Sequence, residues 1–225
     1  MKKSGIFFVM VAVLFHSGCQ YAGLGTLLGT PSYHERKVPA EYNLAEHTGQ
    51  KILVLVEQPG WIDANVNFRY YLTKAINNNL TNLVKIEQDY VIPYSELSEF
   101  RSNQADFSLL SPVEVGIALD ADIVLLVVLD GFSLRILDEI GYHTGLLEAK
   151  AVLIETATEK KLWPESEENK NIKVGFEIDS RGREVAMARL IAASAYCTAR
   201  YFYNCPKNKF KISEDRSHLA WQDWK

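Results

Sequence analysis

Eight residues in the middle of the chain, Asp122-Ile-Val-Leu-Leu-Val-Val-Leu129, carry seven consecutive apolar side chains. A short apolar run rich in β-branched residues is typical of a strand that is buried on both faces. Lys51-Ile-Leu-Val-Leu-Val56 has the same character. Strands of this kind belong to sheets with helices on both sides, so the two runs predict an α/β fold.

The segments around these runs predict helices and one more strand. Residues 64–82 have a broad apolar face, and Asp63 is suited to cap that helix. Residues 84–92 are expected to form a second strand, stopped by Pro93, and residues 95–100 a short helix. Ser111-Pro-Val-Glu114 is a capping-box sequence and predicts a helix that runs to about Leu119.

The second half of the chain predicts antiparallel structure. Residues 145–156 and 161–163 are expected to form a hairpin around Ala157-Thr-Glu-Lys160, and residues 172–178 alternate as a strand does. Residues 183–203 form a long amphipathic pattern typical of a helix. The predicted fold is therefore α/β with α+β character in its second half, a mixed sheet with a parallel core flanked by helices plus an antiparallel hairpin.

The first residues have the three-part pattern of a secretory signal. Lys2 and Lys3 precede an apolar run from Gly5 to Phe15, and the small residues Ser17 and Gly18 follow. As a helix the run would span about 17 Å, which is short of a hydrocarbon core of about 30 Å. The run therefore predicts a cleaved leader and not a membrane span.

Ser17-Gly18-Cys19 resembles the lipobox of bacterial lipoproteins, although His16 stands where leucine is usual. The resemblance implies cleavage before Cys19 and acylation of this residue, with palmitate among the acyl chains. Gln20 is not the aspartate of the inner-membrane retention signal, which favours the outer membrane. The alternative is cleavage after Gly23-Leu-Gly25, which would release a soluble protein.

These patterns divide the chain into four parts. Residues 1–18 are the expected signal peptide, and residues 19–48 a lipidated N-terminus and flexible tether. Residues 49–205 form the single predicted α/β domain, and residues 206–225 a polar tail. The net charge of −4, with no basic stripe, argues against nucleic-acid binding.

A wider resemblance follows from the order of the elements and two loose motifs. Ala118-Leu-Asp-Ala-Asp-Ile-Val enters the central strand, and Glu155-Thr-Ala-Thr-Glu-Lys-Lys-Leu-Trp163 forms the expected hairpin. The chain resembles the envelope α/β domain shared by the N-terminal part of TolB, CsgG and LpoB. In that family glycine is usual where Asp120 and Glu159 stand, and aspartate where Glu155 stands. The resemblance implies a non-enzymatic assembly factor, activator or oligomeric secretion component.

Glu57 and Asp130 are the candidate acid–base residues. Each follows one of the two most buried strands, and ligands of open α/β sheets bind beyond the carboxyl ends of the strands. Paired carboxylates act as acid and base when their environments separate their pKa values. The alternative, which we favour, is that each begins a solvated turn. The histidines are scattered, so no metal site or cofactor is predicted.

Cys197 and Cys205 leave two interpretations open. A bridge requires the chain to turn back near Asn204–Pro206, because eight residues of continuous helix span about 12 Å, beyond disulfide reach. Otherwise they are two separate core thiols.

The sequence thus predicts a periplasmic domain held to a membrane through Cys19, without enzymatic activity, that docks on another envelope protein or on copies of itself. A ring-forming secretion component, and a hydrolase or small-ligand binder near Glu57 and Asp130, are the alternatives.

Overall fold

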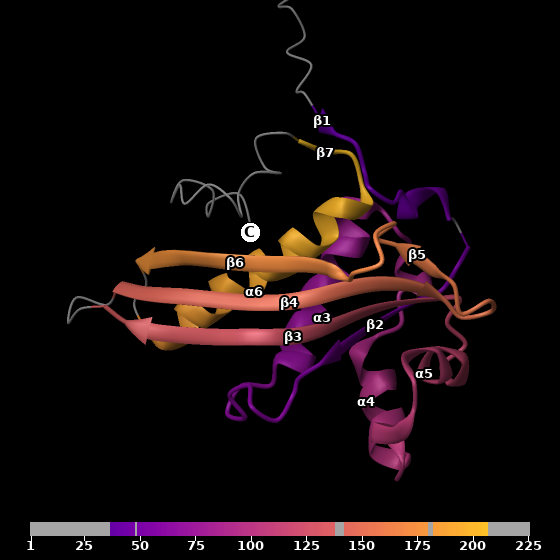
Figure 1. The fold of residues 1–225 in the computed structure, drawn as a ribbon, viewed down its shortest axis with the longest axis horizontal. Helices are drawn as coiled ribbons and strands as arrows, with labels where there is room; N and C mark the ends of the chain where they lie inside the picture. The colour runs from indigo at the N-terminus through magenta and orange to yellow at the C-terminus, as the bar shows by residue number, and fades with distance from the viewer. Residues whose placement is uncertain (1–36, 48, 138–141, 180–181, 207–225) are drawn as a thin grey trace, which may run out of the picture. The chain divides into compact units, whose positions relative to one another are not determined.

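The computed structural model describes residues 37–47, 49–137, 142–179 and 182–206 (Figure 1). The predicted leader, the predicted lipidation site Cys19 and the predicted polar tail after Pro206 lie outside the described residues. Among the helices of the described ranges, we find none with the length and apolar character needed to span a membrane.

A mixed sheet lies at the centre of the described domain (Figure 1). It contains β2 (Ile52–Glu57), β3 (Ile123–Ile136), β4 (Tyr142–Glu155), β5 (Lys161–Trp163) and β6 (Lys170–Asp179). β2 pairs with β3 in parallel, and the pairings of β3, β5 and β6 with β4 are antiparallel. The predicted fold class, the hairpin of β4 and β5, and the strand at β6 are confirmed.

Helices cover both faces of this sheet, but unequally. α3 (Phe68–Asn79) and α6 (Arg183–Ala199) bury Leu72, Ile76 and Leu190 in the main core, against the inward side chains of β2, β3, β4 and β6. α4 (Tyr94–Asn103) and α5 (Pro112–Ala118) form a smaller core over β2 and the start of β3. In Figure 1, α3 and α6 lie behind the strands.

The capping box of α5 is formed as predicted. The Ser111 side chain accepts a hydrogen bond from the amide of Glu114, and the Glu114 carboxylate accepts one from the amide of Ser111, at 3.2 and 2.7 Å. These two bonds occupy amides at the helix start that have no partner within the helix. The helix ends at Ala118, as expected from the sequence.

The prediction of a helix over 64–82 with Asp63 as its cap is wrong in its start. α3 begins at Phe68, and the side chain of Asn67 accepts from the Tyr70 amide at 3.1 Å. Asp63 instead accepts from the backbone amide of Asn65 at 3.0 Å. This bond, from an aspartate side chain to the amide two residues later, forms an Asx turn, a local geometry that competes with helix formation.

The strand predicted over 84–92 is also wrong. The helix continues as a π-helical turn over Leu80–Val84, and Lys85 then takes a φ of 73°. A 3₁₀ turn follows at Gln88–Tyr90, and an isolated bridge joins Val91 to Ile52. Val84 and Val91 are buried, as a strand would predict, but Val84 ends the π-helical turn and Val91 follows the 3₁₀ turn.

β3 does not end at Asp130-Gly131. The ladder with β4 shifts register between Leu129 and Gly131, leaving Asp130 opposite no residue, and continues to Ile136. An extra residue in one strand is a β-bulge. The Asp-Gly pair thus accommodates a bulge within a long strand, where the sequence suggested a turn.

The described domain includes part of the segment that the sequence assigned to the tether. β1 (Lys37–Val38) pairs with β7 (Cys205–Pro206) in a two-stranded antiparallel sheet. Leu44 is 1% exposed and belongs to the main core. Residues 37–47 therefore include chain that belongs to the folded domain, because β1 pairs with a strand far along the chain and Leu44 packs in the core.

Cys197 and Cys205 are buried thiols in the structure and are not joined by a disulfide. The hydroxyl of Tyr196 lies 3.2 Å from the sulfur of Cys205. Of the two interpretations left open by the sequence, the structure contains the one with two separate core thiols.

Candidate functional site

The two candidate acid–base residues lie on neighbouring strands, since Glu57 is in register with Val128, two residues before Asp130, but each is paired with a cation. Glu57, at the end of β2, is bound by the Nη2 of Arg101 at 3.1 Å, and Asp130, at the bulge of β3, by the Nζ of Lys150 at 3.1 Å. Each carboxylate therefore has its own cation. A charge compensated in this way is a different environment from that of two carboxylates sharing a proton.

A cavity of about 430 Å³ lies instead at the carboxyl end of β2. Its wall is formed by the loop from Gln58 to Asn67, by Arg69 at the start of α3, and by Tyr94 and Arg101 of α4. Its volume falls within the range of small-molecule sites. The position agrees with the expectation that ligands of α/β sheets bind beyond the ends of parallel strands.

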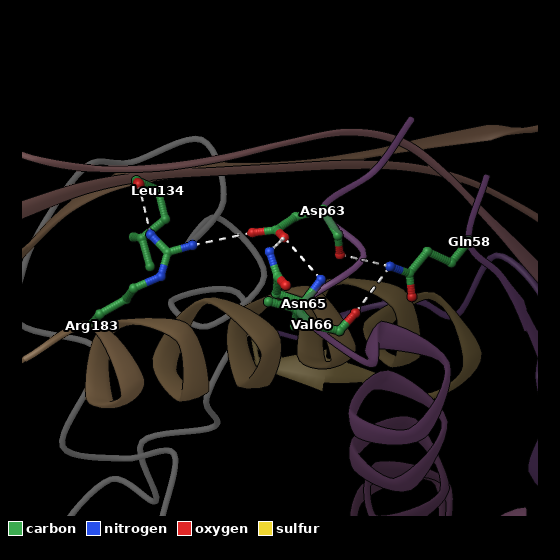
Figure 2. A network of polar contacts seen from close by, with 6 residues as sticks. All are labelled: Gln58, Asp63, Asn65, Val66, Leu134 and Arg183. Carbon is green, nitrogen blue, oxygen red and sulfur yellow. Dashed lines mark hydrogen bonds and ion pairs between the residues drawn. The ribbon is translucent and has the colours of Figure 1, made fainter. Parts of the chain in front are cut away.

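The amide of Gln58 holds the loop of this wall in place (Figure 2). Its Nε2 donates to the carbonyls of Asp63 and Val66, at 3.0 and 2.9 Å, and its Oε1 accepts from the amide of Phe68 at 3.1 Å. One half-buried side chain thus satisfies two carbonyls of the loop and the first amide of α3.

The same loop is fastened to the sheet and to α6 by Arg183. Its guanidinium donates to the carbonyl of Leu134 on β3 and to the carboxylate of Asp63, both at 3.2 Å (Figure 2). The two carboxylate oxygens of Asp63 therefore make different contacts. Oδ1 accepts the local hydrogen bond from the Asn65 amide, and Oδ2 forms the long-range ion pair with Arg183. The cavity wall is consequently held from both ends.

Two guanidinium groups give the cavity its electrostatic character. Arg69 donates from Nη2 to the carbonyl of Gln58 at 3.2 Å, and its buried Nε makes no hydrogen bond. Arg101 lies 4.5 Å from the ring centre of Phe107 and pairs with Glu57. Burial lowers the pKa of Arg101, Glu57 raises it, and the charge of Arg69 lowers it further, with a downward net effect.

Sequence reasoning located the edge of the sheet but missed these arginines. The rule about strand ends pointed to Glu57 and the loop after it. Arg69 and Arg101 are 32 residues apart in sequence and lie on two different helices, and no spacing marks them as partners. Only the packing of α3 beside α4 brings them to one cavity.

The histidines give no sign of a metal site in the described ranges. His47 stacks on Tyr42 with ring centres 5.0 Å apart. No group of three metal-ligating side chains occurs among the residues that the structure describes.

Exposed apolar side chains occur at the end of the sheet where β3 ends and β4 begins. Ile136, Leu137 and Tyr142 are 69%, 52% and 40% exposed, and Val185, in the first turn of α6, is 43% exposed. We call these four residues, which surround this end of the sheet and do not share one face of it, the hairpin-end patch. In Figure 1, α6 begins at this same end of the sheet.

Comparison with known proteins found no matching family model and no matching curated protein. Lipoprotein GNA1162 from Neisseria meningitidis is 19% identical, over 60% of this chain and 89% of its own, with a TM-score of 0.41. A PelC dodecamer from Paraburkholderia phytofirmans is 13% identical, over 74% and 96%, with a TM-score of 0.37. The LpoB C-terminal domain from Salmonella enterica is 17% identical, over 61% and 84%, with a TM-score of 0.34. Similar solved structures thus include bacterial lipoproteins, but at these TM-scores nothing about function follows.

Proposed function

We propose that this chain is a lipoprotein of the bacterial cell envelope whose domain is a non-catalytic binding module. The observation that carries the proposal is the leader, in which Lys2 and Lys3, an eleven-residue apolar run and Ser17-Gly18 end on Cys19. Acylation of Cys19 would hold the domain at a membrane, because two or three acyl chains anchor firmly. Gln20 favours the outer membrane, with the domain in the periplasm.

The exposed hairpin-end patch supports a binding role. Apolar side chains that remain in water are candidates for burial against another protein. A membrane anchor confines both partners to one surface and raises their effective concentration, so that a modest interface suffices. The expected partner is another envelope protein, and a second copy of this chain is the alternative.

The ion pairs of Glu57 and Asp130 support the non-catalytic half of the proposal. A general base needs a carboxylate that is available to a substrate proton. Here each of the two carboxylates is engaged by a cation of a neighbouring element, Arg101 on α4 or Lys150 on β4. The hydrolase alternative therefore receives no support from their arrangement.

Replacement of the acylated cysteine tests the anchor. Cys19→Ala should move the protein from the membrane fraction to the soluble periplasmic fraction, and mass spectrometry of the wild-type N-terminus should find an acylated Cys19. Gln20→Asp is the matched control, because it keeps the cysteine and is expected to leave the protein in the inner membrane. A Cys19→Ala protein still in the washed membrane pellet would contradict the proposal.

Site-specific crosslinking tests the binding role. A photoreactive residue in place of Leu137 should give a discrete crosslinked product in intact cells, whereas one in place of the exposed Lys85 should not. Light scattering of the detergent-extracted protein then separates the alternatives. A mass of many subunits would favour the ring-forming component, and equal crosslinking from both positions would argue against a specific surface.

A further inference from the structure

We propose that the cavity at the end of β2 binds a small molecule through a single carboxylate, to which Arg69 and Arg101 donate hydrogen bonds. The inference concerns the cavity alone and holds whether or not Cys19 is acylated. It differs from the hairpin-end patch in both place and chemistry.

The first reason is the unused hydrogen-bonding capacity of Arg69. A guanidinium carries five N–H donors in a planar fork suited to a carboxylate. The Nη2 of Arg69 binds the Gln58 carbonyl at 3.2 Å, but its Nε is buried and makes no hydrogen bond. Among the described residues the guanidinium makes no other hydrogen bond to the protein, so its terminal N–H groups remain available to a ligand carboxylate in the cavity that Arg69 lines.

The second reason is the charge balance. Arg69 and Arg101 both line the cavity, and each guanidinium is close enough to influence the other. Glu57 compensates Arg101 from beside the cavity, at 3.1 Å. Two positive charges and one negative charge leave a net charge of about +1, which matches one carboxylate and not a doubly charged phosphate.

The third reason is the rest of the wall. Pro59, Ile62, Ala64 and Val66 contribute apolar surface, and Gln58, Asn67 and Tyr94 add polar groups to the two arginines, so the wall is mixed in polarity. Small-molecule sites combine such a wall with a few polar groups that fix orientation. Because Gln58 and the clasp of Arg183 on Asp63 hold this loop, the wall is already formed without the ligand.

Benzoate is a suitable probe, with benzamide as its neutral counterpart and inorganic phosphate as the competing anion. The full-length protein, extracted in detergent and labelled with ¹⁵N-arginine, is titrated with each probe. Benzoate should saturably shift the side-chain Nε–H signals of Arg69 and Arg101, and benzamide should not. Phosphate binding more tightly than benzoate would overturn the carboxylate assignment.

Variants test the assignment in opposite directions. Arg69→Gln should weaken benzoate binding at least about tenfold, the loss of a charged hydrogen bond. Glu57→Gln should strengthen it, by up to about fivefold, because the competing carboxylate is removed. Arg135→Gln, on an exposed position of β3, is the matched control and should change nothing. A gain of affinity cannot result from misfolding, so weaker or unchanged binding in Glu57→Gln would refute the proposal.

Discussion

The indole Nε1 of Trp163 donates a hydrogen bond to Oε2 of Glu41, 2.8 Å away, and joins segments that are 122 residues apart. The other carboxylate oxygen of Glu41 is paired with Lys170. The Trp163 ring is buried against Phe202, with centres 4.9 Å apart. The residues before β2 are thereby fastened to the hairpin and to the end of α6.

Removal of the indole donor should therefore destabilise the domain. Trp163→Phe keeps an aromatic ring but loses a hydrogen bond to a charged acceptor, with an expected cost of about 1.5–3 kcal/mol in urea unfolding. Glu41→Gln is the comparison. It keeps an acceptor for the indole and loses only the partly exposed pair with Lys170, so its cost should stay below about 1 kcal/mol. Equal costs would mean that the ion pair, and not the indole, fastens this segment.

Gly116 is a position where a side chain does not fit. A Cβ there would lie 2.6 Å from Cγ2 of Val124 and 2.7 Å from Cγ2 of Thr156. α5 can approach β3 this closely only because residue 116 has no side chain. Gly116→Ala should lower the free energy of unfolding by about 1–3 kcal/mol, the usual cost of overpacking. Gly60→Ala is the control, since nothing lies within 4 Å of its added Cβ. A neutral Gly116→Ala would show that α5 can move away freely.

Asp120 and Glu159 occupy left-handed backbone conformations, with φ values of 54° and 58°. These are the two positions at which the family resemblance leads one to expect glycine. Left-handed backbone costs a non-glycine residue roughly 1–2 kcal/mol, partly offset by the greater entropy that glycine loses on folding. Glu159→Gly should therefore raise the thermal midpoint, with a gain of up to about 1 kcal/mol. Asp120→Gly should gain less, because it also removes the ion pair with Lys51.

The capping box of α5 should make stability depend on pH. Hydrogen bonding from the Ser111 amide, and then from its side chain, lowers the pKa of Glu114 below its ordinary value of 4.5. A carboxyl group whose pKa is lowered by folding stabilises the protein above the ordinary pKa and loses this effect as pH falls through the folded value. The difference in stability between wild type and Glu114→Gln should thus be present at pH 7 and shrink below pH 4.5.

Loss of the cap itself gives an independent measurement. Ser111→Ala should cost about 1 kcal/mol at neutral pH, as is usual for an N-cap serine. Chemical denaturation at several pH values measures both effects. A pH-independent difference for Glu114→Gln would show that the carboxylate is not held by the cap.

The loop around the cavity should open locally when Gln58 is replaced. Gln58→Ala leaves the carbonyls of Asp63 and Val66 and the amide of Phe68 without their partner. We expect faster hydrogen exchange at the Phe68 amide and a stability loss of about 1–3 kcal/mol. Asp63→Asn removes the partly exposed pair with Arg183 and should cost less than about 1 kcal/mol. Unchanged exchange in Gln58→Ala would mean that the loop is held by other contacts.

Local patterns were sufficient for several elements. The apolar runs at 52–56 and 123–129, the capping box at Ser111 and the alternation at 172–178 each act over a few residues. Binary pattern and capping chemistry are local, so the sequence alone predicts such elements well. The prediction of a strand over 84–92 was wrong because the buried residues there lie in or beside short helical turns. The spacing of apolar residues alone does not distinguish such turns from a strand.

The leader also predicts where the protein is located in the cell, and this prediction does not depend on the fold. The signal pattern ending on Cys19 depends on the order of residues and not on contacts between distant ones. The expectation of a lipid-anchored envelope protein therefore comes from the chain itself, and the described residues, which begin at Lys37, leave it as a proposal.

Tertiary structure decided everything that depends on residues far apart. The pairing of Trp163 with Glu41, the continuation of β3 through Asp130, and the meeting of Arg69 with Arg101 all arise when separate elements pack on one sheet. Side-chain chemistry alone left Glu57 and Asp130 as a possible pair of carboxylates. Packing gave each its own cation and placed a positively charged cavity beside Glu57, because charge compensation depends on distance in space and not along the chain.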